Sequence, residues 1–445
     1  MSGVAVGGDA PSFAMLTDTV LEQFSRRGYE RHGHRSVQAD RTDTSLFVSG
    51  GIQNWRSWFL DPAEATGARV GAQWCVRMNR LADLDHKSGT SFCMVSAVRR
   101  GMRDRRPLIS DTVEILADCG VDPGALAFVV SGADADRPAD DHTYAALRQL
   151  GVPPERIAVK AQRWSRPFRP LGPTGPNLFV LMDTDAECSP SCSPLCGCGR
   201  YLHFWNCEFL DHTVNPQGML VAAAMPGSDI AGSTDRLTLA RRKSTGSFWD
   251  SPELAGSVAA ARKALIDGAY PGLAQGRHFP LFLDHGRTVA LLLGSGVTMS
   301  ARAHGHVLRR LIRRMATALI VESSSPELTA PLVAAASASV TGAHGFPAAE
   351  SVRSRLSEID AEVAGFVAHV DRGRRRFETE LAHRSSDQDL AEAMFRIKSS
   401  LGVPMDILLA WLNEEGADVG AKHLHDLLSH ERIRSRSGQE DAGHA

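Results

Sequence analysis

The chain has 445 residues, which is too long for one compact core and indicates two or three domains. Its 43% hydrophobic and 22% charged residues are typical of an ordinary globular protein and exclude a fibrous or disordered chain. The 51 acidic residues nearly balance the 49 lysines and arginines, so a globally basic nucleic-acid binder is excluded, while a local basic patch is not. No run approaches the roughly 20 apolar residues of a membrane span, and residues 1–14 lack the pattern of a signal peptide; we therefore expect a cytoplasmic protein with no membrane partner.

The first half of the chain is expected to mix helices and strands. Apolar and β-branched runs predict strands over residues 45–48, 73–77, 126–130, 178–182 and 201–210. Helical spacing predicts helices over residues 13–27, 110–119 and 141–150. Ser110 or Asp111 is the expected cap of the second helix, and Glu114 lies in its first turn. Residues 163–176 are rich in Pro and Gly and are expected to form a loop.

Helix signals dominate after about residue 251. The clearest helix is predicted over residues 307–319, where an apolar stripe faces away from Arg309, Arg310, Arg313 and Arg314. Such a basic face usually lies in solvent, although it can also contact phosphates, as can the run Arg372 to Arg376. The change in character predicts a mixed domain over residues 1–245, a helical domain over 246–430 and a disordered polar tail over 431–445.

Four of the eight cysteines lie close together in a loop rich in Gly, Pro and Ser: Cys188, Cys192, Cys196 and Cys198. Four thiolates suit a tetrahedral structural zinc ion, which would order a loop that has almost no apolar residues of its own. His203 could replace one thiolate, and the alternative to a metal site is a set of reduced free thiols. We expect a structural Zn²⁺ rather than a catalytic one, because four protein ligands leave no open position.

Seven segments carry more specific motifs, in the order SLFVSGGIQNWRSWFL (45–60), QWCVRMNRLADLDHKSG (73–89), GPTGPN (172–177) followed by Asp183, CGRYLHFWNCEF (198–209), SDIAGSTDRL (228–237), DHGRTVALLLGSGVTMSARAHGHVLRRLIRR (284–314) and GVPMD (402–406). Together these segments resemble the alanyl-tRNA synthetase family. The resemblance implies an α+β fold, with a class II synthetase-type antiparallel β-sheet flanked by helices as the catalytic domain. A mostly helical domain that contacts the tRNA acceptor stem would follow. Since the likeness ends there, we expect a truncated, divergent paralogue without the family's editing domain.

The resemblance also implies roles for individual residues. Arg77 matches the motif 2 arginine that contacts the α-phosphate of ATP and the amino-acid carboxylate, and Arg236 matches the motif 3 arginine at the γ-phosphate. A planar guanidinium that is always charged suits both tasks. Asp229 matches the acid that binds the substrate ammonium, and Asn206 matches a pocket asparagine. The alternatives are surface arginines in weak ion pairs, an aspartate in a turn and an amide at a strand end. ATP and Mg²⁺ are the implied cofactors.

Several positions depart from the family pattern. Leu81 replaces a basic residue of motif 2, Arg169 replaces an aromatic residue at the mouth of the pocket, and Glu208 replaces an apolar residue of its wall. Buried charges need a partner or a charged ligand. Arg169 and Glu208 could pair with each other, or one of them could bind a polar acceptor.

Two further departures concern the acceptor. The family's asparagine and aspartate that recognise the G·U pair of the acceptor stem correspond to Ile320 and Ser399. Neither side chain can make the same hydrogen bonds. We therefore expect an amino-acid-activating ligase that forms an aminoacyl-adenylate, alanyl by resemblance. It would transfer the acyl group to a carrier protein, a small-molecule amine or a sulfamoyl nucleoside, as in antibiotic biosynthesis. An enzyme that still charges a tRNA and a non-catalytic RNA- or protein-binding paralogue are the two alternatives.

Overall fold

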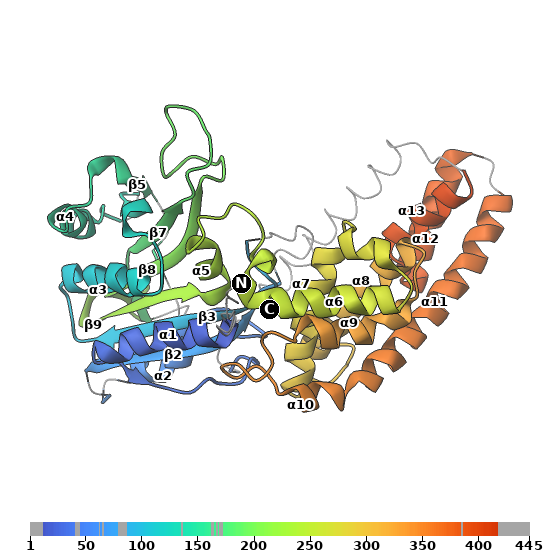
Figure 1. Cartoon of the computed structure of the whole chain (residues 1–445), viewed down its shortest axis with the longest axis horizontal. Coiled ribbons are helices and arrows are strands. Elements are labelled where there is room, and N and C mark those ends of the chain that lie inside the picture. The colour runs from blue at the N-terminus through green and yellow to red at the C-terminus, as the bar shows by residue number, and fades with distance from the viewer. Residues whose placement is uncertain are drawn as a thin grey trace, which may run out of the picture.

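The computed structural model describes residues 12–40, 45–61, 63–64, 66–78, 87–134, 137–161, 164–165, 168, 172–383 and 386–416. A β-sheet with its helices forms one part of the molecule and a group of helices forms the other, side by side along the long axis (Figure 1). The predicted α+β class is confirmed, with sheet and helical region in the expected order.

The sheet has nine strands, and its main order is β1-β2-β3-β9-β8-β7-β4-β5, with β6 paired to β8. The strands are β1 (Glu30–Arg31), β2 (Gly67–Val76), β3 (Ser91–Arg100), β4 (Leu126–Gly132), β5 (Ile157–Ala161), β6 (Gly172–Thr174), β7 (Asn177–Asp183), β8 (Tyr201–Val214) and β9 (Leu220–Ser233). All pairs within the centre are antiparallel, whereas β1–β2 and β4–β5 at the two ends are parallel. The predicted antiparallel sheet is therefore confirmed, with a parallel pair at each edge.

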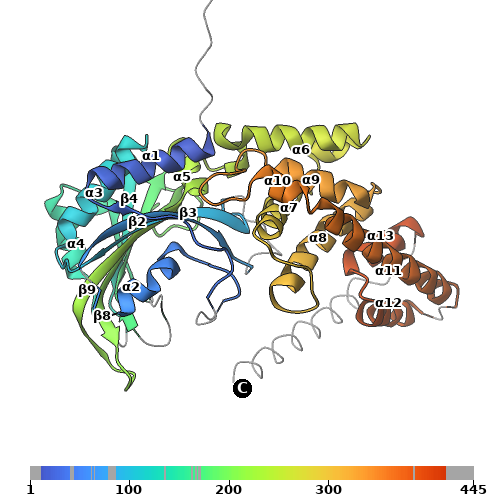
Figure 2. The same ribbon diagram turned by 90° about the horizontal axis from the view of Figure 1, so that it is seen from below.

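Helices cover both faces of the sheet (Figure 2). On one face lie α1 (Phe13–Arg26), α3 (Arg105–Asp118) and α4 (Asp141–Gln149). Helix α1 begins where the Ser12 hydroxyl accepts a hydrogen bond from the Met15 N–H, and it buries its apolar stripe against the main core. On the other face, the turn η1 (Gly51–Trp55) and α2 (Arg56–Leu60) form a smaller core with apolar side chains of β3 and β8. Helix α5 (Thr234–Ala240) directly follows β9.

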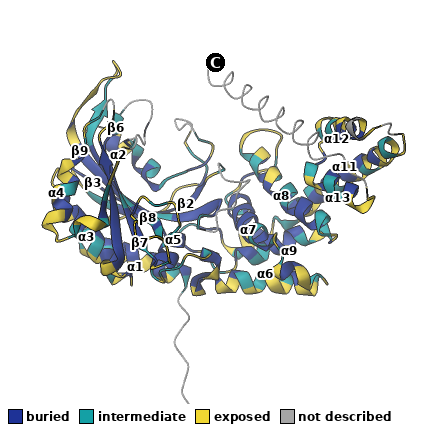
Figure 3. Ribbon diagram, turned by 90° about the horizontal axis from the view of Figure 1, so that it is seen from above, coloured by how far each residue is buried: buried dark blue, intermediate teal, exposed yellow. Residues whose placement is uncertain are grey.

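The helical region contains α6 (Ala255–Asp267), α7 (Phe279–Gly294), α8 (Ala303–Val321), α9 (Thr329–Ala336), α10 (Ala349–Arg353), α11 (Leu356–Ala382), α12 (Asp387–Leu401) and α13 (Met405–Glu414). Helix α7 is its centre, because 13 of its 16 residues are buried (Figure 3). It packs against α8 and α9 and also contacts β3. A helix that is buried nearly all round lies inside a core, and the polar residues that α7 buries there need partners. It therefore connects the helical region to the sheet.

Some expected elements differ in the structure. Residues 45–48 form no strand, only an isolated bridge between Phe47 and Gln38, because β2 pairs instead with β3 and β1. Helix α3 begins at Arg105 with Asp104 as its cap, since Pro107 is tolerated in the first turn. Residues 163–176 were expected to form a loop, but Gly172–Thr174 within them form β6, which pairs with β8. Strands β3 and β9 were not predicted, and both lie in the centre of the sheet.

The element order changes from strands to helices in the second half of the chain. The last strand ends at Ser233, and the described elements from Phe248 onward are helical. The boundary between residues 245 and 246 stays a prediction, and the predicted tail over 431–445 lies outside the described residues. Within the described ranges, no helix is long and apolar enough to cross a membrane.

Candidate active site

A cavity of about 190 Å³ opens on the face of the sheet that also carries η1. Strands β3, β8 and β9 supply most of its wall, and the start of α5 and the segment before β3 supply the rest. Its lining residues are Arg77, Ser88, Gly89, Thr90, Phe92, Met94, His203, Phe204, Asn206, Ala231, Gly232, Ser233, Asp235 and Arg236. The two predicted catalytic arginines thus line one cavity together.

Arg77 directly follows β2. Its Nε donates a hydrogen bond to the backbone oxygen of Ser49 at 2.7 Å, and its guanidinium lies 4.9 Å from the centre of the Phe92 ring. Its backbone N–H donates to the carbonyl of Thr90 at 2.9 Å, which extends the β2–β3 pairing beyond the strand ends. These contacts direct the side chain toward the cavity, which Arg77 lines.

Arg236 lies in the first turn of α5. The Ser233 hydroxyl caps this helix by accepting a hydrogen bond from the Arg236 N–H at 3.2 Å. The guanidinium donates to the hydroxyl of Ser88 and to the carbonyl of His203, the latter at 3.0 Å. The side chain is therefore fixed between β8 and the segment before β3, as a cation that positions a phosphate must be.

Asp229 and Glu208 lie beside this cavity. They are direct cross-strand neighbours in β9 and β8, and the next pair on the same face, Ala231 and Asn206, lines the cavity. Asp229 is only 3% exposed, and its Oδ1 accepts a hydrogen bond from the Ser96 hydroxyl at 2.7 Å. Glu208 Oε2 accepts one from the Ser165 hydroxyl at 2.5 Å.

Burial changes the protonation of these carboxyls. It raises the pKa of Asp229 well above its usual value, and the neighbouring Glu208 raises it further. Burial also raises the pKa of Glu208, while the Ser165 hydroxyl and the charge of Arg77 act in the opposite direction. A positively charged ligand between the two carboxyls would stabilise both ionised forms and would oppose these shifts.

His203 determines how Asn206 is oriented. Its Nε2 lies 2.5 Å from the Asn206 Oδ1, and because an amide oxygen can only accept, the imidazole donates this hydrogen bond. Burial, followed by the charge of Arg236, lowers the pKa of His203 to about 4. The ring is thus neutral near pH 7, and the amide nitrogen of Asn206 is left available to the cavity.

A buried ionic network, which the sequence did not reveal, connects α7 to this site. Arg287 Nη1 lies 2.6 Å from Asp235 Oδ1, next to Arg236. Asp284 accepts hydrogen bonds from both the N–H and the hydroxyl of Thr90, at 2.7 and 2.6 Å. The only sequence signal was that both α7 residues belong to the segment 284–314. The network places the helical region in contact with two walls of the cavity.

The four clustered cysteines converge as predicted. Their sulfur atoms all lie within 4.8 Å of one another, with Cys188 and Cys196 at 3.9 Å and Cys192 and Cys198 at 3.8 Å. Thiolates about 2.3 Å from a tetrahedral zinc ion are separated by similar distances, so the donor set fits this metal. The Arg200 N–H, which donates to the Cys198 sulfur, lowers the pKa of that thiol to about 7. His203 lies in the active-site cavity instead, bonded to Asn206.

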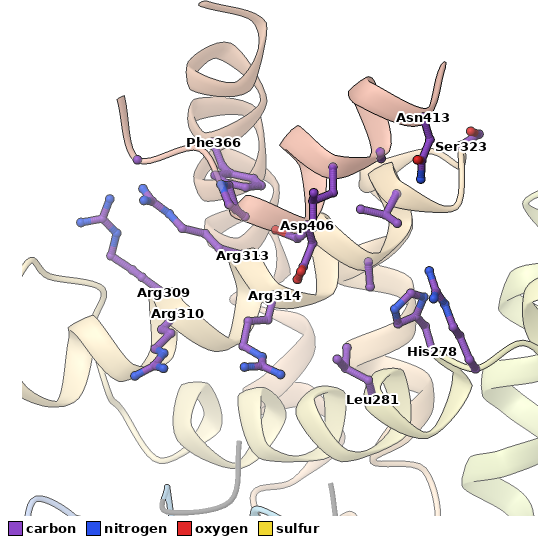
Figure 4. A pocket seen from close by; sticks show the side chains of 18 of the residues that line it. His278, Leu281, Arg309, Arg310, Arg313, Arg314, Ser323, Phe366, Asp406 and Asn413 are labelled. Atoms are coloured by element: carbon purple, nitrogen blue, oxygen red, sulfur yellow. The ribbon is translucent and has the colours of Figure 1, made fainter. Parts of the chain in front are cut away.

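The arginines of α8 line a separate, larger groove of about 1200 Å³ (Figure 4). Arg309 and Arg313 pair with Glu362 of α11 at 3.0 and 2.6 Å, whereas Arg310 and Arg314 point to another side of α8. Burial and the charge of Arg310 lower the pKa of Arg314. The predicted basic face is therefore partly neutralised and partly presented to the groove.

The two expected acceptor-stem positions lack suitable groups in the structure as well. Ile320 is partly buried against the main core. The Ser399 hydroxyl donates to the carbonyl of Phe395 in its own helix, at 2.8 Å. Arg169 and Leu81 lie outside the described residues, and so does the expected pairing of Arg169 with Glu208.

Comparisons with known proteins identify the family of the chain. The family model "tRNA synthetases class II (A)" matches residues 16–445. Alanine–tRNA ligase of Treponema denticola is 27% identical over 67% of this chain and 51% of its own length. Those of Anaeromyxobacter dehalogenans and Bdellovibrio bacteriovorus are 25% and 26% identical, over 95% and 92% of this chain and 51% and 48% of their own. The chain spans about half the length of these relatives.

Among solved structures, apo Staphylococcus aureus histidyl-tRNA synthetase matches 55% of this chain and 71% of its own, with 12% identity and a TM-score of 0.35. The family model, by contrast, covers nearly the whole sequence, including both arginines of the cavity. The chain therefore belongs to the family of class II (A) tRNA synthetases, as an alanyl-tRNA-synthetase-like member.

Proposed function

We propose that this protein activates a small α-amino acid with ATP and forms an aminoacyl-adenylate. Arg77 and Arg236 would bind the phosphates of ATP, Asp229 the α-ammonium of the amino acid, and Asn206 its polar groups. The single observation that carries this proposal is that both guanidinium groups line one cavity beside a buried carboxylate. A site with phosphate-binding cations next to an ammonium-binding anion suits a reaction between ATP and an amino acid.

The reaction balances without an acid or a base. A carboxylate oxygen of the amino acid attacks the α-phosphorus of ATP, and a new P–O bond forms. The bond from the α-phosphorus to the oxygen bridging to the β-phosphate breaks, and pyrophosphate leaves with the electron pair. The protein's task is to position the two substrates and to stabilise charge on the phosphate oxygens. Mg²⁺ would enter with ATP and neutralise part of its charge.

The acceptor that we propose is not alanine tRNA but a small-molecule amine, a sulfamoyl nucleoside or a carrier protein. Ile320 and Ser399 support this choice, since one offers no hydrogen bond and the other donates to its own helix. In addition, Glu362 of α11 neutralises the charges of Arg309 and Arg313. The alternative, charging of a tRNA, is favoured by Arg310 and Arg314 in the groove.

Aminoacylation assays separate these alternatives. We expect alanine tRNA to accept alanine at less than about one hundredth of the rate at which the enzyme forms the adenylate. If alanine tRNA were charged as fast as the adenylate forms, tRNA would be the acceptor and our proposed acceptor would be wrong.

The activation itself is tested by amino-acid-dependent exchange of labelled pyrophosphate into ATP. We expect exchange by the wild type and a loss of at least about 100-fold in Arg77→Ala and Arg236→Ala, because each removes a positioned cation. Arg353→Ala, an exposed arginine of α10, is the matched control and should retain wild-type exchange. Exchange that survives within about threefold in both cavity variants would contradict the assigned roles. No exchange with any amino acid would favour a non-catalytic binding protein.

A further inference from the structure

The feature that stands out within the candidate site is a second carboxyl. Glu208 and Asp229 face each other across the β8–β9 pair, where side chains on the same face lie about 4.5–5.5 Å apart at Cβ. One amino group of a substrate needs one carboxylate. The site thus offers one anionic group more than an α-ammonium requires.

Among the described residues, no lysine or arginine forms an ion pair with either carboxyl, while Arg169, the possible partner of Glu208, lies outside them. Asp229 accepts a hydrogen bond from Ser96 and Glu208 one from Ser165, both from hydroxyl groups. The charge of Arg77 acts on Glu208 and lowers its pKa, against the effect of burial. Ser96 is itself fixed by the indole N–H of Trp55 at 3.1 Å, so Asp229 cannot turn away easily.

Two adjacent carboxyls, one buried and one half-buried, ionise together only at a considerable cost unless they are compensated. A substrate with one ammonium and an apolar side chain compensates Asp229 but places a methyl group against Glu208. A carboxyl that loses its contact with water and gains no hydrogen bond weakens binding. A substrate with a second ammonium compensates both groups at once.

Resting on the proposed activation reaction, we propose that the amino acid activated here is a short diamino acid, of the class of 2,3-diaminopropionate. Asp229 binds its α-ammonium and Glu208 binds the ammonium on its side chain. The short side chain follows from the direct opposition of the two carboxyls, because the two ammonium groups that they bind must then lie close together. The carboxylate of the substrate remains directed toward Arg77 and the α-phosphate.

The test measures pyrophosphate exchange with alanine, serine, 2,3-diaminopropionate, 2,4-diaminobutyrate and lysine. For the wild type we expect kcat/KM for 2,3-diaminopropionate to exceed that for alanine by about 100-fold or more, because an unpaired buried group strongly disfavours a substrate that cannot bind it. Glu208→Val should reverse this order, with most of the loss for the diamino acid in KM. Glu155→Val, which replaces an exposed glutamate of the turn before β5, is the control and should keep the wild-type order.

Each outcome has a distinct meaning. Exchange with alanine as the best substrate, unchanged in order by Glu208→Val, overturns the assignment of a diamino acid and leaves the activation reaction standing. A preference for serine also overturns the assignment of a diamino acid, because Glu208 would then bind a hydroxyl group of the substrate. Exchange with no amino acid overturns the activation reaction itself. Should Glu208→Val fail to fold, Glu208→Gln, which keeps the size and removes the charge, must show the same loss for the diamino acid.

Discussion

At the scale of single residues, Glu208 and Asp229 dominate the electrostatics of the site. Burial raises the pKa of both carboxyls, so each binds a proton more tightly in the folded protein than in the unfolded chain. The free energy of unfolding must then decrease as the pH rises through the interval between the unfolded and the folded pKa values. The pair thus destabilises the substrate-free protein most at neutral and higher pH.

Replacing Glu208 by Gln removes one of the two charges while keeping the shape. We expect the free energy of unfolding without substrate to increase by about 1–2 kcal/mol at pH 8, and to change less at pH 5, because the raised pKa favours the protonated carboxyl as the pH falls. Urea unfolding at both pH values measures this difference, with Glu155→Gln as the exposed control. Equal effects at pH 5 and pH 8 would show that the carboxyl charge has no such cost.

The candidate residues could be predicted from the sequence only through the family's motifs. Arg77 and Arg236 are 159 positions apart, and nothing in their local patterns shows that they line one cavity. The pairing of Glu208 with Asp229 depends on the register of β8 and β9, and β9 was not predicted at all. Its small residues, with several alanines and glycines, lack the β-branched and aromatic side chains that identify a strand.

At the scale of elements, α7 is linked to the sheet by buried charges rather than by apolar contacts alone. Arg287 pairs with Asp235 in α5, and Asp284 binds the Thr90 segment before β3. Both contacted segments form walls of the active-site cavity. The helical region therefore contributes to the shape of the site without supplying a group to the substrate.

Arg287→Met tests this link, because it leaves Asp235 buried without its partner. We expect a loss of about 3–5 kcal/mol in the free energy of unfolding, the usual cost of breaking a buried pair. The double variant Asp235→Asn/Arg287→Met should recover part of that loss, since it removes the unpaired charge as well. Denaturant unfolding provides both values, and a single variant as stable as the wild type would contradict the role of the pair.

The cysteine loop between β7 and β8 is the element with the least apolar support of its own. If the four thiolates bind zinc, purified protein should contain about one zinc ion per chain, and a chelator should make the loop sensitive to protease. Metal binding displaces thiol protons, so the affinity should rise from pH 6 to pH 8, and it should keep rising above pH 8 because the pKa values of Cys192 and Cys196 are raised.

Cys192→Ser should lower the zinc content, and Ser191→Ala in the same loop should not. Elemental analysis and limited proteolysis provide the two readouts. Protein without zinc, with an equally resistant loop before and after chelation, would show that the cysteines are free thiols.

At the scale of the whole molecule, the cavity lies on the sheet and the basic groove lies in the helical region. The order of the two parts could be predicted because long periodic segments identify helices such as α1 and α8, whereas the fold class followed from the family resemblance. The assignment of residues 45–48 as a strand was wrong, since a short apolar run cannot show whether a neighbouring strand is available to pair with it. Strand pairing depends on contacts between distant parts of the chain, which local patterns do not contain.

An amino acid labelled with oxygen-18 in its carboxylate shows whether this carboxylate attacks ATP. If a carboxylate oxygen attacks the α-phosphorus of ATP, that oxygen becomes the bridge of the adenylate and stays with AMP when the acyl group is transferred or hydrolysed at its carbonyl carbon. We expect mass spectrometry to detect one labelled oxygen in each AMP that forms with 2,3-diaminopropionate or alanine as substrate. AMP that forms without the label, or turnover that produces no AMP, would contradict it.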